Sequence, residues 1–190
     1  MATDAVSGAT AVAPSFFDED SYETVDGQRV ELPPMSVQEI RLANLLARYL
    51  WWALGEHPTG EVFVEMLFRL RREPVLDRKP DVAYVPYGKW PDRIVPVAEA
   101  WEMIPALAVE VVSKSNTVWE TQQKVEDYFR SGVNLLWVIH PKQRSVHVYT
   151  SPKNIKALDG NDTLDGGTVL PSFRLSVREL FATLPPQTGA

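Results

Sequence analysis

The stretch from residue 107 to residue 139 constrains the fold most, because strand, helix and strand patterns follow one another with only short turns between them. Residues 107–112 are an apolar run of strand length, typical of a strand buried on both faces. A helical stretch over residues 118–131 ends at Gly132, since glycine tolerates the left-handed backbone of a helix end. Residues 134–139 are a second buried strand. This unit predicts two parallel strands with a right-handed crossover.

Patterns elsewhere add further strands. Asp26-Gly27 between two short alternating runs predicts a hairpin over residues 22–32, because glycine accepts the positive φ of a tight turn. Further strands are expected over residues 61–70, 81–85 and 145–150, with a short strand or two near residues 158 and 169.

A first helix begins after Ser36, whose hydroxyl forms a capping box with Glu39, and it closes at Gly55. Its predicted apolar stripe consists of Ile40, Ala43, Leu46, Tyr49 and Leu50. A brief helix is expected over residues 177–181. These elements indicate an α/β (α+β) fold, with a mixed sheet flanked by helices.

The length of 190 residues fits one domain over residues 16–190, after a tail over residues 1–15 that is expected to be disordered. Hydrophobic residues make up 45% of the chain, enough for an ordinary core. The formal net charge of -6 argues against a protein that coats nucleic acid by bulk charge, although an enzyme can still meet nucleic acid at one local groove.

The chain contains no cysteine, which excludes disulfides, thiolate zinc sites and cysteine nucleophiles and suits an intracellular protein. No apolar stretch approaches the roughly 18 residues that a bilayer helix needs. The N-terminus has no pattern of a secretory signal. We therefore expect no membrane contact and a cytoplasmic location.

Glu110 is the most unusual residue, because a carboxylate inside an apolar strand is costly to bury unless it is paired or bound to a cation. Asp81 is its natural companion, since it starts a second apolar strand directly after Pro80. Two carboxylates on neighbouring strands supply hard oxygen ligands suited to Mg²⁺ or Mn²⁺.

Lys124 supplies a third element from the helix that leaves the Glu110 strand, with Tyr128 one turn later. A lysine there can orient a metal-bound water or help to deprotonate it, and can stabilise charge on a phosphoryl oxygen. Glu120 stands four residues before it, placed to pair with Lys124.

Structural interpretations of the same residues remain open. An Asp after Pro is usually a turn residue, and a lone Lys on an amphipathic helix is usually solvated. The pair of Glu120 and Lys124 can be a surface pair only, and Glu110 can be a buried acid bonded to an arginine.

Several motifs together resemble the Uma-two family, a bacterial group of proposed restriction endonucleases in the PD-(D/E)XK nuclease superfamily. The match spans roughly residues 22–181 and rests on the order and spacing of these segments: Pro80-Asp81-Val82-Ala83-Tyr84-Val85, Val109-Glu110-Val111-Val112-Ser113, Lys124 with Tyr128, Gly132-Val133 and Leu136-Trp137-Val138-Ile139. The resemblance implies a restriction-endonuclease-like core with the site at one edge of a mixed sheet. It also implies that Asp81, Glu110 and the backbone carbonyl of Val111 bind the divalent metal.

Lys124 matches the position to which this family moves the lysine of the wider superfamily, which otherwise stands where this chain has Val112. Glu23 matches an upstream acid of the family that joins the site. The chain departs from the pattern in two places: Glu39 stands near where many relatives have a histidine, and His140 stands where most have an aspartate.

The three histidines are interpreted as structural. His140 precedes Pro141 at a strand end and has the pattern of a turn residue, and His57 and His147 look equally structural. No histidine pair has the sequence spacing of a zinc site.

A nucleic-acid groove would use the basic residues near the Asp81 strand, which are Arg69, Arg71, Arg72, Arg78 and Lys79. A charged hairpin tip explains this cluster equally well.

The leading hypothesis is a Mg²⁺-dependent or Mn²⁺-dependent DNA endonuclease that hydrolyses a phosphodiester through a metal-activated water, with Asp81, Glu110 and Lys124 as catalytic residues. The alternative is a non-catalytic binding or regulatory domain with a nuclease fold, and a third is a hydrolase of smaller phosphate esters. DNA is the expected partner, and Trp51 with Trp52 can seed a homodimer.

Overall fold

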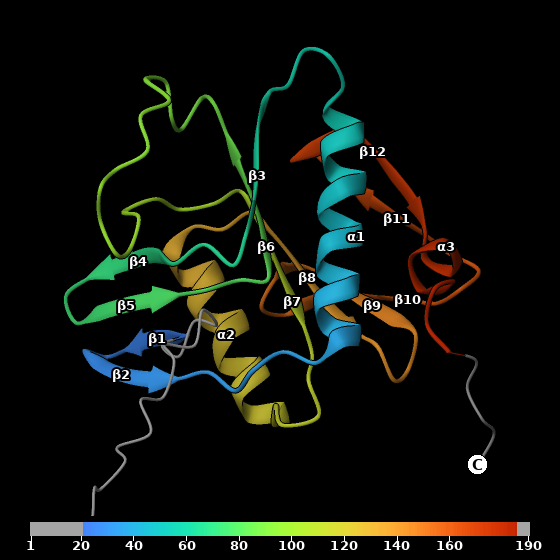
Figure 1. Ribbon diagram of the computed structural model, residues 1–190, viewed down its shortest axis with the longest axis horizontal. Coiled ribbons are helices and arrows are strands. Elements are labelled where there is room, and N and C mark those ends of the chain that lie inside the picture. Colours follow the sequence, from blue (N-terminus) through green and yellow to red (C-terminus); the bar gives the residue numbers. More distant parts are fainter. Residues whose placement is uncertain (1–20, 186–190) are drawn as a thin grey trace, which may run out of the picture.

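A six-stranded mixed sheet forms the centre of the protein, as Figure 1 shows for the computed structural model, which describes residues 21–185. The tail expected over residues 1–15 lies outside the described residues. The strands of this sheet, in spatial order, are β10 (Asn154–Leu158), β9 (Ser145–Ser151), β8 (Leu135–His140), β7 (Leu107–Val111), β6 (Val82–Pro86) and β3 (Gly60–Val64).

β7 and β8 are parallel and are joined by α2 (Val118–Ser131), while every other neighbouring pair in this sheet is antiparallel. The prediction of a strand–helix–strand unit with parallel strands is confirmed. Thr117 and Glu120 form a capping box at the start of α2. Gly132 ends the helix with φ of 99°, which a residue with a side chain adopts only under strain.

A smaller sheet lies beside the large one, in the order β2 (Gln28–Glu31), β1 (Tyr22–Val25), β5 (Val75–Arg78) and β4 (Phe68–Arg72). β1 and β2 form the predicted hairpin, with positive φ at Asp26 and Gly27. The single strand expected over residues 61–70 is wrong. The chain breaks at Glu65, where φ is 51°, so that β3 joins the large sheet and β4 joins the small one.

α1 (Val37–Leu54) packs against one face of the large sheet and begins at the predicted capping box of Ser36 and Glu39. Ala43, Leu46 and Leu50 of the predicted stripe are buried, whereas Ile40 is 44% exposed. Leu42 and Leu45, outside the predicted stripe, are buried as well. The helix contacts β12 (Leu170–Ser176) and α3 (Val177–Phe181) as well as the sheet, so its apolar face is wider than one stripe.

The C-terminal elements are β11 (Thr163–Gly166), β12 and α3.

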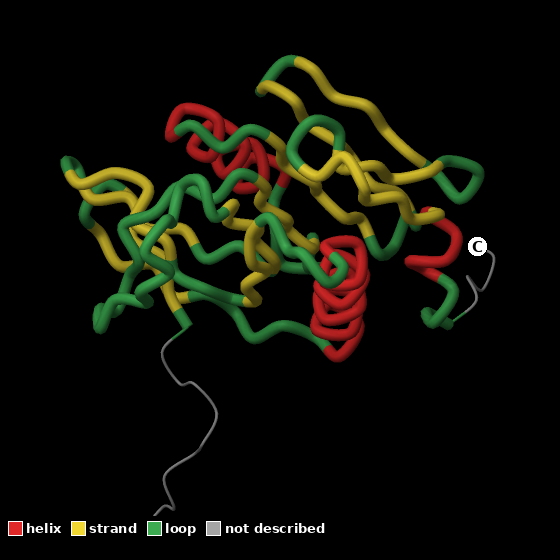
Figure 2. The backbone as a smooth tube through the Cα atoms, turned by 90° about the horizontal axis from the view of Figure 1, so that it is seen from above, coloured by secondary structure: helices red, strands yellow, loops and turns green. Residues whose placement is uncertain are grey.

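α2 covers the opposite face of the large sheet, so that the two long helices lie apart with strands between them (Figure 2). Val125 and Tyr128 of α2 pack there with alternate residues of the strands, among them Ala108 and Leu136. Glu110 follows the same alternation two residues after Ala108 on β7, so it also faces α2. No helix within residues 21–185 combines the length and the apolar character that crossing a bilayer requires.

Candidate active site

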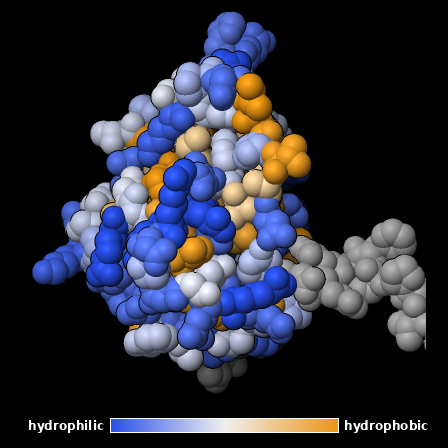
Figure 3. All heavy atoms as spheres, turned by 90° about the vertical axis from the view of Figure 1, so that its left-hand side faces the viewer, coloured by the Kyte–Doolittle hydropathy of each residue, from blue (hydrophilic) through white to orange (hydrophobic). Residues whose placement is uncertain are grey.

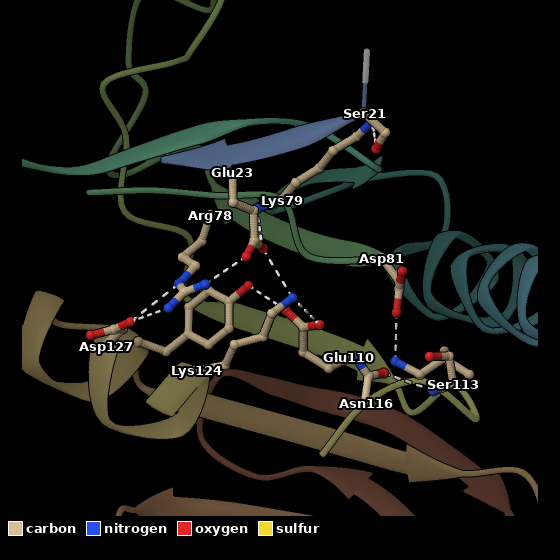
Figure 4. A network of polar contacts seen from close by, with 12 residues as sticks. Ser21, Glu23, Arg78, Lys79, Asp81, Glu110, Ser113, Asn116, Lys124 and Asp127 are labelled. Carbon is tan, nitrogen blue, oxygen red and sulfur yellow. Dashed lines mark hydrogen bonds and ion pairs between the residues drawn. The ribbon is translucent and has the colours of Figure 1, made fainter. Parts of the chain in front are cut away.

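Glu110 lies near the end of β7 and faces α2, where both of its carboxylate oxygens receive a donor (Figure 4). Lys124 Nζ is 2.9 Å from Oε2, and the hydroxyl of Tyr128 donates to Oε1 at 2.5 Å. Lys124 and Tyr128 are one helical turn apart, so both project from the same side of α2. The sequence-predicted pair of Glu110 and Lys124 is therefore in direct contact.

Glu23 joins the same network from β1 of the small sheet (Figure 4). Its Oε1 lies 2.9 Å from Lys124 Nζ and accepts the backbone N–H of Lys79 at 3.1 Å. Its Oε2 accepts from Arg78 at 2.5 Å, and Arg78 donates its Nε to Asp127 on α2 at 3.2 Å. Glu23 and Arg78 are both buried, so this chain of charges links the two sheets and α2 in the interior.

The charges of this network fix the protonation of Lys124. Burial alone would lower the pKa of Lys124, but the neighbouring carboxylates of Glu110 and Glu23 outweigh it and raise the pKa above its ordinary range. The reverse holds for Glu23, whose pKa stays below its usual value despite burial because of Lys124 and Arg78. Lys124 is consequently a permanent cation near neutral pH and cannot act as a general base there.

Asp81 directly precedes β6 and lies beside Glu110 at the same edge (Figure 4). Its carboxylate accepts one hydrogen bond, from the backbone N–H of Val111 at 2.5 Å. Burial, followed by the charge of Glu110, raises the pKa of Asp81 to about 8. The backbone bond and Lys124 oppose that shift without cancelling it. An ionised Asp81 would therefore carry a costly negative charge that no side chain in direct contact neutralises.

The backbone of Val111 faces Asp81. The N–H of Val112 bonds to Ile139 on the β8 side, whereas the N–H of Val111 points the other way, to Asp81. In an extended strand, the N–H and C=O of one residue point to the same side. The carbonyl oxygen of Val111 therefore also faces the Asp81 side.

A cavity of about 20 Å³ adjoins Glu110 and Lys124, lined further by Val112, Asn116 and Thr121 among others. This is room for one water molecule, and Glu110 and Lys124 supply polar partners for it. The site therefore has a position where a small polar molecule can contact Lys124.

Several contacts in and around this network were not foreseen. The expected pair of Glu120 with Lys124 is replaced: Glu120 bonds to the N–H and hydroxyl of Thr117 as part of the capping box. Arg78, which we expected to face nucleic acid, pairs instead with Glu23 and with Asp127 in the interior. No sequence signal marked Asp127, because its partner lies on a strand 49 residues earlier.

The other basic residues of the predicted groove are also paired. Arg69 binds Asp77 through two hydrogen bonds of 2.8 and 3.0 Å, Arg71 binds Asp26, and Arg72 binds Glu102. Lys79 contacts the hydroxyl of Ser21 and lies 3.5 Å from Glu65. Their role in nucleic-acid binding stays a prediction.

An open hollow of about 610 Å³ is lined by Arg69, Arg71, Arg72, Lys89 and residues at the end of α2. Figure 3 looks onto this side of the molecule, where hydrophilic side chains dominate. Each of the three arginines that line the hollow has an acidic partner, and one of these acids, Glu102, lines the hollow as well.

A divalent metal fits the donor set at Asp81. Asp81 has no cation in direct contact, the carbonyl of Val111 faces it, and Glu110 lies next to it; all three supply hard oxygen donors of the kind that Mg²⁺ and Mn²⁺ prefer. Within residues 21–185, however, no three His, Asp or Glu side chains lie close enough together to hold an ion by themselves. A metal here would keep waters in its other positions.

The mixed sheet with a helix on each face has a nuclease fold, as a solved structure shows. A crystal structure described as "a putative nuclease belonging to DUF820 from Anabaena variabilis" has the same fold, with a TM-score of 0.75 at 15% identity. The alignment covers 85% of this chain and 89% of that one.

Residues 12–178 match the sequence profile of the Uma2 (Uma-two) family, described as "Putative restriction endonuclease". The chain therefore belongs to this family, as the motif order predicted. No curated protein matches the chain.

Proposed function

We propose that this protein is a metal-dependent endonuclease that hydrolyses phosphodiester bonds of DNA, with Asp81, Glu110 and Lys124 as its reactive centre. The observation that carries the proposal is the contact of Lys124 Nζ with Glu110 at 2.9 Å, next to a partly buried Asp81 that has no cation in direct contact. Membership of a family described as restriction endonucleases supports DNA as the substrate.

The charge of each residue determines its proposed role. Asp81, Glu110 and the carbonyl of Val111 would hold Mg²⁺ or Mn²⁺. A divalent ion bound there supplies positive charge and lowers the pKa of water. Lys124 remains protonated and so serves as a donor that positions the scissile phosphate and offsets charge on its oxygens.

Glu23 and Tyr128 act through Lys124 and Glu110 as positioning residues. Glu23 accepts from Lys124 at 2.9 Å, and Tyr128 donates to Glu110 at 2.5 Å. Both residues are buried. Because Lys124 bridges Glu110 and Glu23, its ammonium group is held in one place before any substrate arrives.

Cleavage of supercoiled and linear DNA, with Mg²⁺ and with a chelator, tests the proposal. We expect cleavage only with the metal, and at least about a hundredfold slower cleavage by Asp81→Asn, whose amide still accepts the Val111 N–H. Glu110→Gln is expected to lose activity similarly. Asp92→Asn, at an exposed loop acid, is the matched control and should cleave normally. Full activity in a correctly folded Asp81→Asn protein would contradict the assignment.

A binding or regulatory domain without catalysis is the second candidate. It is favoured by the closed contacts of Glu110, whose two oxygens are already taken by Lys124 and Tyr128. Calorimetric titration with Mn²⁺ distinguishes the nuclease from the non-catalytic domain. A nuclease should bind Mn²⁺, and Asp81→Asn should abolish that binding. A non-catalytic domain should show no Mn²⁺ binding that depends on Asp81.

DNA and a second copy of the chain are the partners that we propose, with the cytoplasm as the location. The hollow beside Arg71 and Arg72 is the candidate path for the DNA backbone. Trp51 and Trp52 at the end of α1 are 41% and 64% exposed and are the candidate dimer contact.

A further inference from the structure

Two histidines contact each other on neighbouring strands of the six-stranded sheet. His140 ends β8 and His147 lies on β9, where the register pairs His140 with Ser145 and His147 with Val138. The two rings are diagonal neighbours, with Nε2 of His140 3.2 Å from Nδ1 of His147 and ring centroids 4.3 Å apart. The expectation that both were isolated structural residues did not include this contact, which depends on strand pairing.

Both rings are neutral near pH 7. Burial lowers the pKa of His140, and the neighbouring His147 lowers it further; burial also lowers the pKa of His147. Within residues 21–185, each ring makes one hydrogen bond, and that bond is to the other ring. Two half-buried imidazoles therefore present facing nitrogens from a rigid pair of strands, with no carboxylate or carbonyl of the described chain bonded to them.

We propose that His140 Nε2 and His147 Nδ1 bind one divalent ion of the imidazole-preferring kind, such as Zn²⁺, with water completing its coordination. Zinc–nitrogen bonds are about 2.0–2.1 Å long, so nitrogens 3.2 Å apart subtend roughly 100° at the ion, near the tetrahedral angle. The ion lies beside the line joining the nitrogens, so both rings turn slightly to bind it.

The protons balance without an added base. In the free pair, one facing nitrogen donates its proton to the other. In the bound pair, His140 has its proton on Nδ1 and His147 has its proton on Nε2. The ring that donated in the free pair therefore moves its proton to its other nitrogen through water, which frees both facing lone pairs. Both rings stay neutral, and binding releases no net proton near neutral pH.

This site is distinct from the acidic one. Glu110 pairs with Val138 across β7 and β8, and Val138 pairs with His147 across β8 and β9, which separates Glu110 and His147 by about 10 Å between backbones. Donor chemistry separates the two sites as well, since imidazole suits Zn²⁺, Ni²⁺ and Cu²⁺ while carboxylates suit Mg²⁺ and Mn²⁺.

Calorimetric titration of the full chain with Zn²⁺ near neutral pH tests the proposal. We expect one ion per chain, with affinity reduced at least about tenfold in His140→Ala and in His147→Ala. His57→Ala is the matched control, because His57 is the third histidine of the chain and is exposed. Asp81→Asn should also bind Zn²⁺ as the unaltered chain does, because the acidic site does not take part.

Nitrogen-15 spectra of the imidazole rings give a readout that does not depend on stability. Zn²⁺ should shift Nε2 of His140 and Nδ1 of His147 and leave His57 unchanged. If an alanine variant unfolds, His147→Gln replaces it, since it keeps bulk and polarity but places no imidazole nitrogen there. The proposal is overturned if the chain does not bind Zn²⁺ at millimolar concentration, if both histidine variants bind as tightly as the unaltered chain, or if binding is lost only in Asp81→Asn.

Discussion

At the scale of single residues, two buried acids of one site have opposite surroundings. Glu23 contacts the cations Arg78 and Lys124, and its pKa is lowered. Asp81 contacts one backbone N–H, and burial raises its pKa to about 8. Removing the two charges should therefore change stability in opposite directions.

Glu23→Gln should destabilise the protein, because it leaves Arg78 and Lys124 short of a buried counter-charge. The loss expected at neutral pH is about 3–5 kcal/mol in the free energy of unfolding, measured with urea. The folded pKa of Glu23 lies below its unfolded value, so its contribution is present above the unfolded pKa and is lost as the pH falls through the folded pKa. The difference from the unaltered chain should shrink in acid. Glu31→Gln, on the exposed strand of the same hairpin, should change little at any pH.

Asp81→Asn should stabilise the metal-free protein, because the folded chain no longer has to protonate the carboxylate or bury its charge, and the amide still accepts from the N–H of Val111. In a chelating buffer near neutral pH, we expect the midpoint of thermal unfolding to rise by about 5 °C. Added Mg²⁺ should stabilise only the unaltered chain and narrow the difference. Glu56→Gln neutralises an exposed acid and serves as the control. A lower midpoint in Asp81→Asn would show that the ionised carboxylate is favourable without metal.

At the scale of elements, α2 is the part that assembles the site. It carries Lys124, Asp127 and Tyr128, and its C-terminal glycine was predicted from the sequence. Helix ends follow local rules of hydrogen bonding and backbone conformation, so such ends can be predicted from a few neighbouring residues. The direction in which each α2 side chain points could not be predicted in this way, because it depends on where the helix lies on the sheet.

Gly132→Ala should destabilise the end of α2, since Gly132 has φ of 99°. We expect a loss of about 1 kcal/mol or more in urea unfolding. Gly88→Ala is the matched control, because Gly88 is exposed, has no left-handed φ and has open space around its Cα. Equal unfolding free energies for the two variants would mean that the left-handed position carries no cost. Reduced DNA cleavage by Gly132→Ala would link this helix end to Lys124.

At the scale of the whole molecule, the charged network joins three layers. Glu23 comes from the small sheet, Glu110 from the large sheet and Lys124 from α2. The strand pattern over residues 61–70 was misread because the break at Glu65 sends its two halves to different sheets, and strand periodicity does not reveal a change of sheet. β5 was missed for a related reason: its polar residues Asp77 and Arg78 are buried only because partners from other elements neutralise them.

The proposed dimer makes a prediction at this scale. The chain should sediment with twice the monomer mass at high concentration, and Trp52→Ser should shift it towards the monomer by removing an exposed aromatic side chain. Trp119→Ser, at a 70% exposed position on α2, is the control and should behave as the unaltered chain. Monomeric sedimentation of the unaltered chain at all concentrations would contradict the dimer.

The sequence by itself determined the strand–helix–strand unit, the capped start of α1, the glycine ends of both long helices and the family, and it singled out Glu110. These depend on local periodicity, end signals and the cost of a charge among apolar neighbours, all of which act over short stretches of chain. Only the tertiary structure decided which charges meet. It paired Lys124 with Glu23 as well as Glu110, turned Arg78 inward and brought His140 to His147. Contacts between distant segments depend on sheet register and helix position, which no single stretch of sequence encodes.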